Sequence, residues 1–223
     1  MIKRRVVVAA MAVVAITAPT ACADKVSGTS TWPGATLEDV VLTADDFPPG
    51  VQYGRVVEDP GAPDGTGGPP PMLSKPEGCS DALTSVIAAS AERGPGSAAK
   101  YNVAYDGARI VMTVLTWNLD LAKLAATAER CAQYQTFFDP TSPGIPMTTT
   151  RVPSPRPDAL VYRQTMDLNG AKSSVIFSFE NVHKMAAFGI AFPTPNPMIP
   201  VKAALPQTFM TIVGKQAERL QDA

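Results

Sequence analysis

Three cysteines and one histidine are the residues in this sequence whose types most readily support chemistry. The cysteines are Cys22, Cys79 and Cys131, and the only histidine is His183. Cysteine sulfur can carry a lipid, form a disulfide or bind a metal, and imidazole can act as a general base. If two cysteines pair, too few ligands remain for a four-coordinate zinc site. We therefore expect no metal site and no cofactor.

The segment that precedes Cys22 has the pattern of an export signal. A basic cluster at residues 3–5 is followed by an uncharged apolar stretch at 6–16. A helix over that stretch is about 16 Å long, too short for a hydrocarbon core of about 30 Å. Residues 1–21 are therefore predicted to be a signal peptide and not a membrane span.

The signal peptide offers two cleavage sites. Thr20 and Ala21 are small residues directly before Cys22, as a lipoprotein signal peptidase requires, although Pro19 stands where such sites usually carry Leu, Val or Ile. An ordinary signal peptidase would instead cut after Ala23. In the first case Cys22 becomes the lipid-bearing N-terminus, and in the second the chain is secreted.

The polar segment after the cut favours the lipoprotein alternative. Residues 23–36 are small and polar, which is typical of a flexible tether. We predict that diacylglyceryl and palmitate groups on Cys22 anchor the protein to the cell membrane, facing the periplasm-like space. Residues 22–36 then form the tether, and residues 37–223 form one envelope domain.

The charge of the chain argues against a nucleic-acid partner. Removal of residues 1–21 lowers the number of basic side chains from 19 to 16, against 20 acidic ones, and no basic run remains. A nucleic-acid footprint needs clustered Lys and Arg. The predicted partners are the membrane, through the lipid, and an apolar ligand or an envelope protein.

Cys79 and Cys131 are predicted to form a disulfide. Either cleavage leaves these two as the only pair of thiols, and an exported protein meets oxidising conditions. Each lies on the apolar stripe of an expected helix. A bridge between them closes a loop of roughly 50 residues and contributes about 4 kcal/mol in the chain-entropy model. The alternative is two buried free thiols.

The pattern of strands and helices predicts a single α+β domain. The expected fold is an antiparallel β-sheet packed with about three helices and one disulfide. Asp106-Gly107 and Asn169-Gly170 are typical of tight hairpin turns. The expected helices cover 75–94, 118–138 and 205–220, and the expected strands cover 51–57, a hairpin at 101–117, and 146–152, 159–167, 171–180 and 185–193. Val40 is expected to end a strand. Residues 59–71 are expected to form a loop, for which a simple insertion is favoured over a lid.

The sequence shows no recognisable catalytic constellation. His183 lies in an expected turn, and no Gly-x-Ser-x-Gly elbow is present. Asp45 and Asp46 are adjacent carboxylates that could bind calcium, but a capping role is favoured because nothing nearby completes an oxygen-ligand site. We therefore expect a protein that is not an enzyme, with a hydrolase of unrecognised site as the minor alternative.

A binding site is the functional feature that the sequence favours. The strand that ends at Trp117 is apolar on both faces, and two later strands are rich in Phe. Such strands form either a buried core or a hydrophobic cleft between the sheet and a helical layer. The candidates for a ligand-lining role are Met112, Trp117, Phe177, Phe188 and Phe192.

Four short motifs are similar to those of a known family. The motifs "TAC" at 20–22, "LTADDFPPGV" at 42–51, "PEGC" at 76–79 and a later helical Cys131 resemble mycobacterial exported lipoproteins defined by a domain of unknown function. More distantly, the chain looks like the extracellular sensor domain of PknH-type receptor kinases. The resemblance implies a cell-envelope α+β domain with helix-stapling disulfides and a ligand-binding cleft. Those kinase domains carry two disulfides, whereas this chain can form one and has no kinase domain.

The function predicted from the sequence is that of a non-catalytic cell-envelope lipoprotein that binds a lipid-like or peptide ligand. The alternative is a scaffold or accessory subunit of another envelope protein. A crevice continuous with the core favours the first, and an exposed apolar patch favours the second.

Overall fold

The computed structural model of the chain describes residues 33–56, 72–85 and 96–222. Several predictions fall outside these residues. They concern the signal peptide, lipidation of Cys22, most of the tether, the loop at 59–71 and the part of the first expected helix at 86–94.

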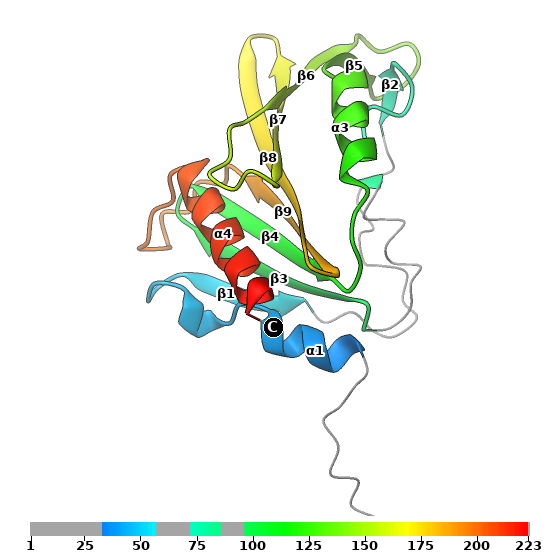
Figure 1. Ribbon diagram of the computed structural model, residues 1–223. Helices are drawn as coiled ribbons and strands as arrows, with labels where there is room; N and C mark the ends of the chain where they lie inside the picture. The colour runs from blue at the N-terminus through cyan, green and yellow to red at the C-terminus, as the bar shows by residue number, and fades with distance from the viewer. Residues whose placement is uncertain (1–32, 57–71, 86–95, 223) are drawn as a thin grey trace, which may run out of the picture.

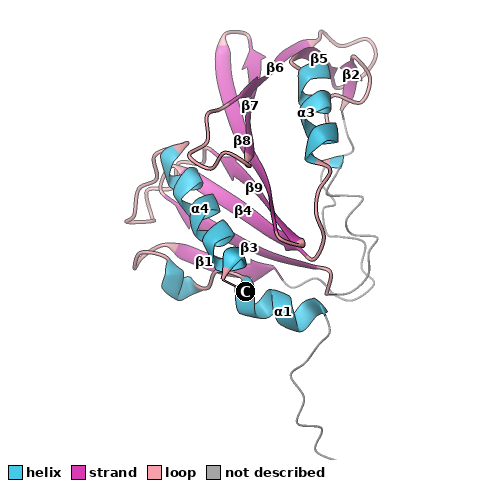
Figure 2. Cartoon of the chain, in the orientation of Figure 1, coloured by secondary structure: helices cyan, strands magenta, loops and turns pink. Residues whose placement is uncertain are grey.

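One antiparallel sheet of nine strands dominates the fold (Figure 1). The strand order is β1-β3-β4-β9-β8-β7-β6-β5-β2. The strands are β1 Gln52–Val56, β2 Leu73–Lys75, β3 Ala98–Tyr105, β4 Ala108–Leu115, β5 Gln133–Phe137, β6 Ile145–Arg151, β7 Leu160–Leu168, β8 Ala171–Val182 and β9 Met185–Phe192. The described part also holds helices α1 Pro33–Val40, α3 Leu121–Arg130 and α4 Gln207–Gln221, and the short 3-10 turn Ala44–Asp46 (Figure 2). The predicted α+β class is confirmed, with more sheet than expected.

The two predicted tight hairpins are present. Gly107 (φ 97°) turns β3 into β4, and Asn169 (φ 53°) with Gly170 (φ 88°) turns β7 into β8. These residue types tolerate positive φ, and therefore the local sequence is sufficient to place both turns.

Helices α1 and α4 cover one face of the sheet. The helix predicted over 205–220 is confirmed as α4, which buries Phe209, Ile212, Val213, Ala217 and Leu220 along one side. Gln216 of α4 is fully buried and joins three elements through its amide: it accepts from Leu42 N (3.3 Å) and from the Tyr101 hydroxyl (3.1 Å), and donates to Val40 O (2.8 Å). Every hydrogen bond that Gln216 makes here is buried, so the network fixes how α4 sits on the sheet.

Helix α3 lies against the opposite face. Leu124 and Ala128 of α3 pack with aromatic side chains of β8 and β9, including Phe179. Phe179 and Phe188 have ring centroids 5.1 Å apart. The two faces of the sheet thus belong to two separate hydrophobic clusters.

The helix predicted over 118–138 is too long at both ends. The helix begins at Leu121, with Asp120 as the N-cap, whose side chain accepts from Lys123 N (2.9 Å). The helix ends at Arg130, and β5 follows, with Tyr134 and Thr136 buried in alternation. Because β5 pairs with both β6 and β2, its backbone is satisfied as a strand, and tertiary pairing overrides the helical pattern.

The described part of the helix predicted over 75–94 is also different. Residues 73–75 form β2, the Lys75–Pro76 peptide bond is cis, and Gly78 has φ 72°. Ser74 Oγ accepts from Cys79 N (2.9 Å) and Ser80 N (3.3 Å), which supplies the turn with the hydrogen bonds that a helix would have made.

Two smaller expectations concern the N-terminal segment. Val40 ends helix α1 and not a strand, and residues 33–36, assigned to the tether, begin that helix. The capping role expected of the carboxylate pair is confirmed for Asp46, which accepts from Thr43 N (2.8 Å) and is paired with Arg219 (2.7 Å).

Candidate functional site

The disulfide between Cys79 and Cys131 is present. The sulfur atoms are 2.07 Å apart and the Cα atoms 5.5 Å apart. Both residues are buried, at 0% and 2% exposure. The expected setting was two helices, whereas Cys79 lies in the turn after β2 and Cys131 caps the end of α3. The bond therefore fastens the end strand of the sheet to α3.

The structure places four of the five predicted lining residues on one side of the sheet. Phe177 and Phe188 are buried in the aromatic cluster below α3, and Trp117 is partly buried against the same cluster. Phe192 shares the face of Phe188, because alternate residues of β9 point the same way, and it is partly exposed.

Met112 lies on the other face. It is fully buried in the cluster below α4. A Cβ built on Gly189 would stand 2.6 Å from Met112 Sδ and 2.8 Å from Phe209 Cε2, which shows how closely these side chains fill that layer. Met112 therefore cannot share a ligand with Phe177 or Phe188, and the role predicted for the other four residues stays a prediction.

A cavity of about 560 Å³ lies beside β2, the end strand of the sheet. Its volume is within the range of small-ligand sites. It is lined by Met72, Leu73, Ser74, Lys75, Glu77, Gly78, Ser80, Asp81, Phe137 and Pro140. The cavity thus combines an apolar end, a strand backbone and a charged turn.

The turn that forms one wall of this cavity is held from several sides. Ser74 Oγ bonds the turn internally, donating to Pro76 O (2.9 Å) as well as accepting from the backbone. Arg130 of α3 donates to Glu77 O (3.1 Å), and the disulfide holds Cys79. The wall is therefore largely fixed before any ligand arrives, which lowers the entropy lost on binding.

Charge in the cavity is unevenly placed. Lys75 Nζ stands 5.5 Å from the centroid of the Phe137 ring. Glu77 is exposed and Asp81 is partly exposed, and within the described residues neither carboxylate has a hydrogen-bond or ion-pair partner. The turn side of the cavity is therefore acidic, and the strand side is apolar with one cation.

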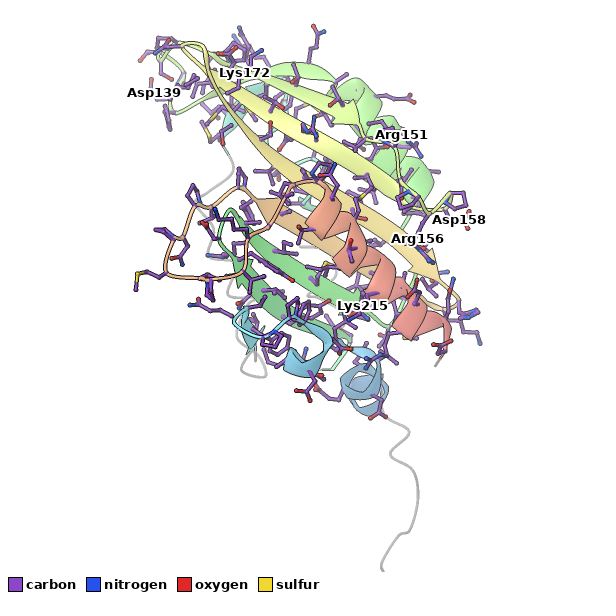
Figure 3. The ribbon with its side chains drawn as sticks, turned by 90° about the vertical axis from the view of Figure 1, so that its left-hand side faces the viewer. Asp139, Arg151, Arg156, Asp158, Lys172 and Lys215 are labelled. Carbon is purple, nitrogen blue, oxygen red and sulfur yellow. A yellow bond between two sulfur atoms is a disulfide. The ribbon has the colours of Figure 1, made fainter. Side chains whose placement is uncertain are left out.

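Large exposed apolar side chains gather at this end of the sheet. Leu73, Phe138 and Leu168 are 49%, 76% and 48% exposed. The strand register places them at one end of the sheet but not on one face: Leu73 is opposite Phe137, whereas Leu168 shares the other face with Ile145 and Thr136. Figure 3 labels two residues of that end: Asp139, which follows Phe138 in the sequence, and Lys172, which follows Ala171, the strand partner of Leu168.

Two pKa values at this end are displaced. Burial raises the pKa of the Tyr134 phenol, which packs against the disulfide, to about 12. Hydrogen bonds from Thr141 lower the pKa of the Asp139 carboxyl. Neither group is poised to exchange a proton near neutral pH.

Little in the described residues points to catalysis. His183 is exposed in the β8–β9 turn, as predicted. In the ranges that the structure covers, no three His, Cys, Asp or Glu side chains gather as metal ligands would, and no helix is long and apolar enough to cross a membrane.

Comparison with known proteins adds a fold likeness only. No family model matches the chain, and no curated protein matches it. The chain is similar to a solved structure of an uncharacterized protein from Mycobacterium smegmatis, with a TM-score of 0.48 and 13% identity, over 85% of this chain and 95% of that chain. A likeness of this size carries no conclusion about function.

Sequence reasoning did not find the cavity beside β2. The motif "PEGC" indicates a family resemblance and a disulfide but no cavity, and the three residues of β2 are too few to show alternation. The available signal was the serine before Lys-Pro, because a Ser side chain is suited to bonding a following turn.

Proposed function

We propose that this protein is a non-catalytic, exported lipoprotein that binds an extended peptide segment of another envelope protein along β2. The observation that carries the proposal is the cavity of about 560 Å³ beside the end strand of the sheet, flanked by half-exposed Leu73. An edge strand offers unpaired backbone groups to a peptide, and adjoining pockets select its side chains.

The chemistry of the cavity indicates the kind of peptide. Met72, Leu73 and Phe137 supply the apolar end, which suits a bulky apolar side chain. Glu77 and Asp81 line the turn, which suits a basic residue beside it. The proposed ligand is therefore an extended segment with neighbouring apolar and basic residues.

The position of the cavity favours a protein partner over a bilayer lipid. Figure 1 shows α1 at one end of the molecule and β2 at the other. If Cys22 carries the lipid, the tether joins the domain at α1, the end of the molecule away from β2. The anchor is tested by metabolic labelling with a fatty acid, which Cys22→Ala should abolish.

The proposal is tested by panning a random peptide library against the protein and measuring the affinity of the enriched peptides. Leu73→Lys should weaken the binding of these peptides about tenfold, because burial of the exposed half of a leucine contributes roughly 1.4 kcal/mol. Leu168→Lys is the matched control: Leu168 is 48% exposed against 49% for Leu73, and it does not line the cavity.

The Leu168→Lys variant should bind the enriched peptides with an affinity within about twofold of that of the unaltered protein, a difference below about half a kcal/mol. Failure to enrich any peptide, or an equal loss with both variants, would contradict the proposal.

A further inference from the structure

A second cavity, of about 400 Å³, lies near β1, the other end strand of the sheet. It is separate from the proposed peptide site and differs from it in chemistry. Its lining is mostly polar: Gln52, Asn102, Ala104, Tyr105, Ala108, Arg109, Thr194 and Asn196.

The rim of this cavity is held in place by hydrogen bonds from backbone N–H groups. Asp106 Oδ1 accepts from Asn196 N (3.0 Å), and Asp106 O accepts from Ala203 N (2.8 Å). Gly107 N donates to Thr194 O (3.2 Å). The β3–β4 turn and the segment after β9 therefore form one rigid border, which keeps Thr194 and Asn196 in position.

The strand register sets the side chains of the floor in rows. Gln52 is opposite Ala104, Ala104 opposite Arg109, and Arg109 opposite Phe192, so these four share a face of the sheet. The partly exposed Phe192 is thus the cross-strand neighbour of Arg109, just outside the lining of the cavity.

Asn102 lies in the neighbouring row, opposite Gly54. A Cβ at Gly54 would stand 3.4 Å from the amide atoms of Asn102, at ordinary van der Waals contact, so the amide lies directly over Gly54. The Asn102 amide consequently lies on the same floor as Arg109.

Arg109 is the charged group of this cavity. It is exposed, and within the described residues its guanidinium has no hydrogen-bond or ion-pair partner. None of the lining residues is acidic, and the nearby Asp106 carboxylate already accepts a backbone N–H. Arg109 is therefore the only charged residue of the lining, and its guanidinium can pair with an anionic group of a ligand.

We propose that this cavity binds a saccharide unit that carries a carboxylate. Guanidinium binds carboxylate through two parallel hydrogen bonds. The amides of Gln52 and Asn102 offer both donors and an acceptor, and Asn196 offers its amide N–H groups while its Oδ1 accepts from Met198 N (3.2 Å); this set matches adjacent sugar hydroxyls. The ring of Phe192 offers an apolar surface to the C–H face of the sugar.

The test is an NMR titration of ¹⁵N-labelled protein with glucuronate, glucose and acetate at equal ionic strength. Glucuronate should shift amide signals of the β3–β4 turn and of residues 192–196, glucose should do so more weakly, and acetate should not. Arg109→Gln should weaken glucuronate binding about tenfold and leave glucose binding unchanged.

Arg163→Gln is the matched control, because Arg163 lies on β7 and points to the face that carries Val161. Binding by this variant should equal that of the unaltered protein. Equal shifts with acetate, no shifts with glucuronate, or a loss that is the same in both arginine variants would overturn the proposal.

Discussion

At the β1 end of the sheet, α4 is held by a buried amide, whereas at the β2 end α3 is held by a covalent bond. Gln216 connects α4 to Leu42, Val40 and Tyr101 inside the larger hydrophobic cluster. The Cys79–Cys131 bond lies in a cluster of only four buried residues.

The difference follows from how much apolar surface each end can bury. The cluster under α4 brings together side chains from α1, α4 and most of the strands. The β2 end has a three-residue strand and the end of one helix. Where a core is too small to hold its elements, a disulfide supplies stability that packing does not. The same small core leaves a cavity beside β2.

The largest effect should come from breaking the disulfide. Cys79→Ala with Cys131→Ala should lower the free energy of unfolding by about 4 kcal/mol, because the loop spans 52 residues. Hydrogen exchange should show β2 and β5 losing protection first, while β3 and β4 keep theirs. Uniform loss across the sheet would contradict the contrast between the two ends.

A smaller effect should follow from removing the buried amide. Gln216→Met keeps the length of the side chain but leaves Tyr101, Leu42 and Val40 without a buried partner, and should cost about 3 kcal/mol in urea unfolding. Gln207→Met, at an exposed position of the same helix, is the control and should change stability by less than about 0.5 kcal/mol. Similar values for the two variants would show that the network does not hold α4.

The smallest effect concerns Glu180 on β8. Its side chain is nearly fully buried, pairs with Arg156 through Oε1 (2.7 Å), and within the described residues leaves Oε2 without a partner. Burial raises the pKa of Glu180 above its usual value. Stability from this group is therefore fully present below the unfolded-state pKa and is lost as the pH rises through the folded-state pKa.

Urea unfolding across a pH series measures this effect. Because Glu180→Gln is neutral at every pH, its advantage over the unaltered protein should shrink as the pH falls. Asp139→Asn is the control with opposite sign. Hydrogen bonds lower the pKa of the Asp139 carboxyl, so the stability that the native carboxylate contributes is lost as the pH falls through its folded-state pKa. A constant difference for Glu180→Gln would contradict the raised pKa.

The strands and the C-terminal helix were predictable because their signals are local. The hairpins around Gly107 and Asn169 and the stripe of α4 each depend on residues a few positions apart. β5 and β2 were not predictable in this way. The segment 133–137 continues a helical pattern, and only its pairing with partners on both sides makes it a strand.

For the candidate sites, the sequence by itself determined the pairing of Cys79 with Cys131, since any export cleavage leaves those two thiols together. It also determined which residue types can carry a ligand. Only the tertiary structure decided that Met112 lies on the other side of the sheet from Phe188, and that Gln52, Arg109 and Asn196 border one cavity. The physical reason is that a strand's period of two fixes which residues share a face, but the choice of face depends on strands and helices that are distant in sequence.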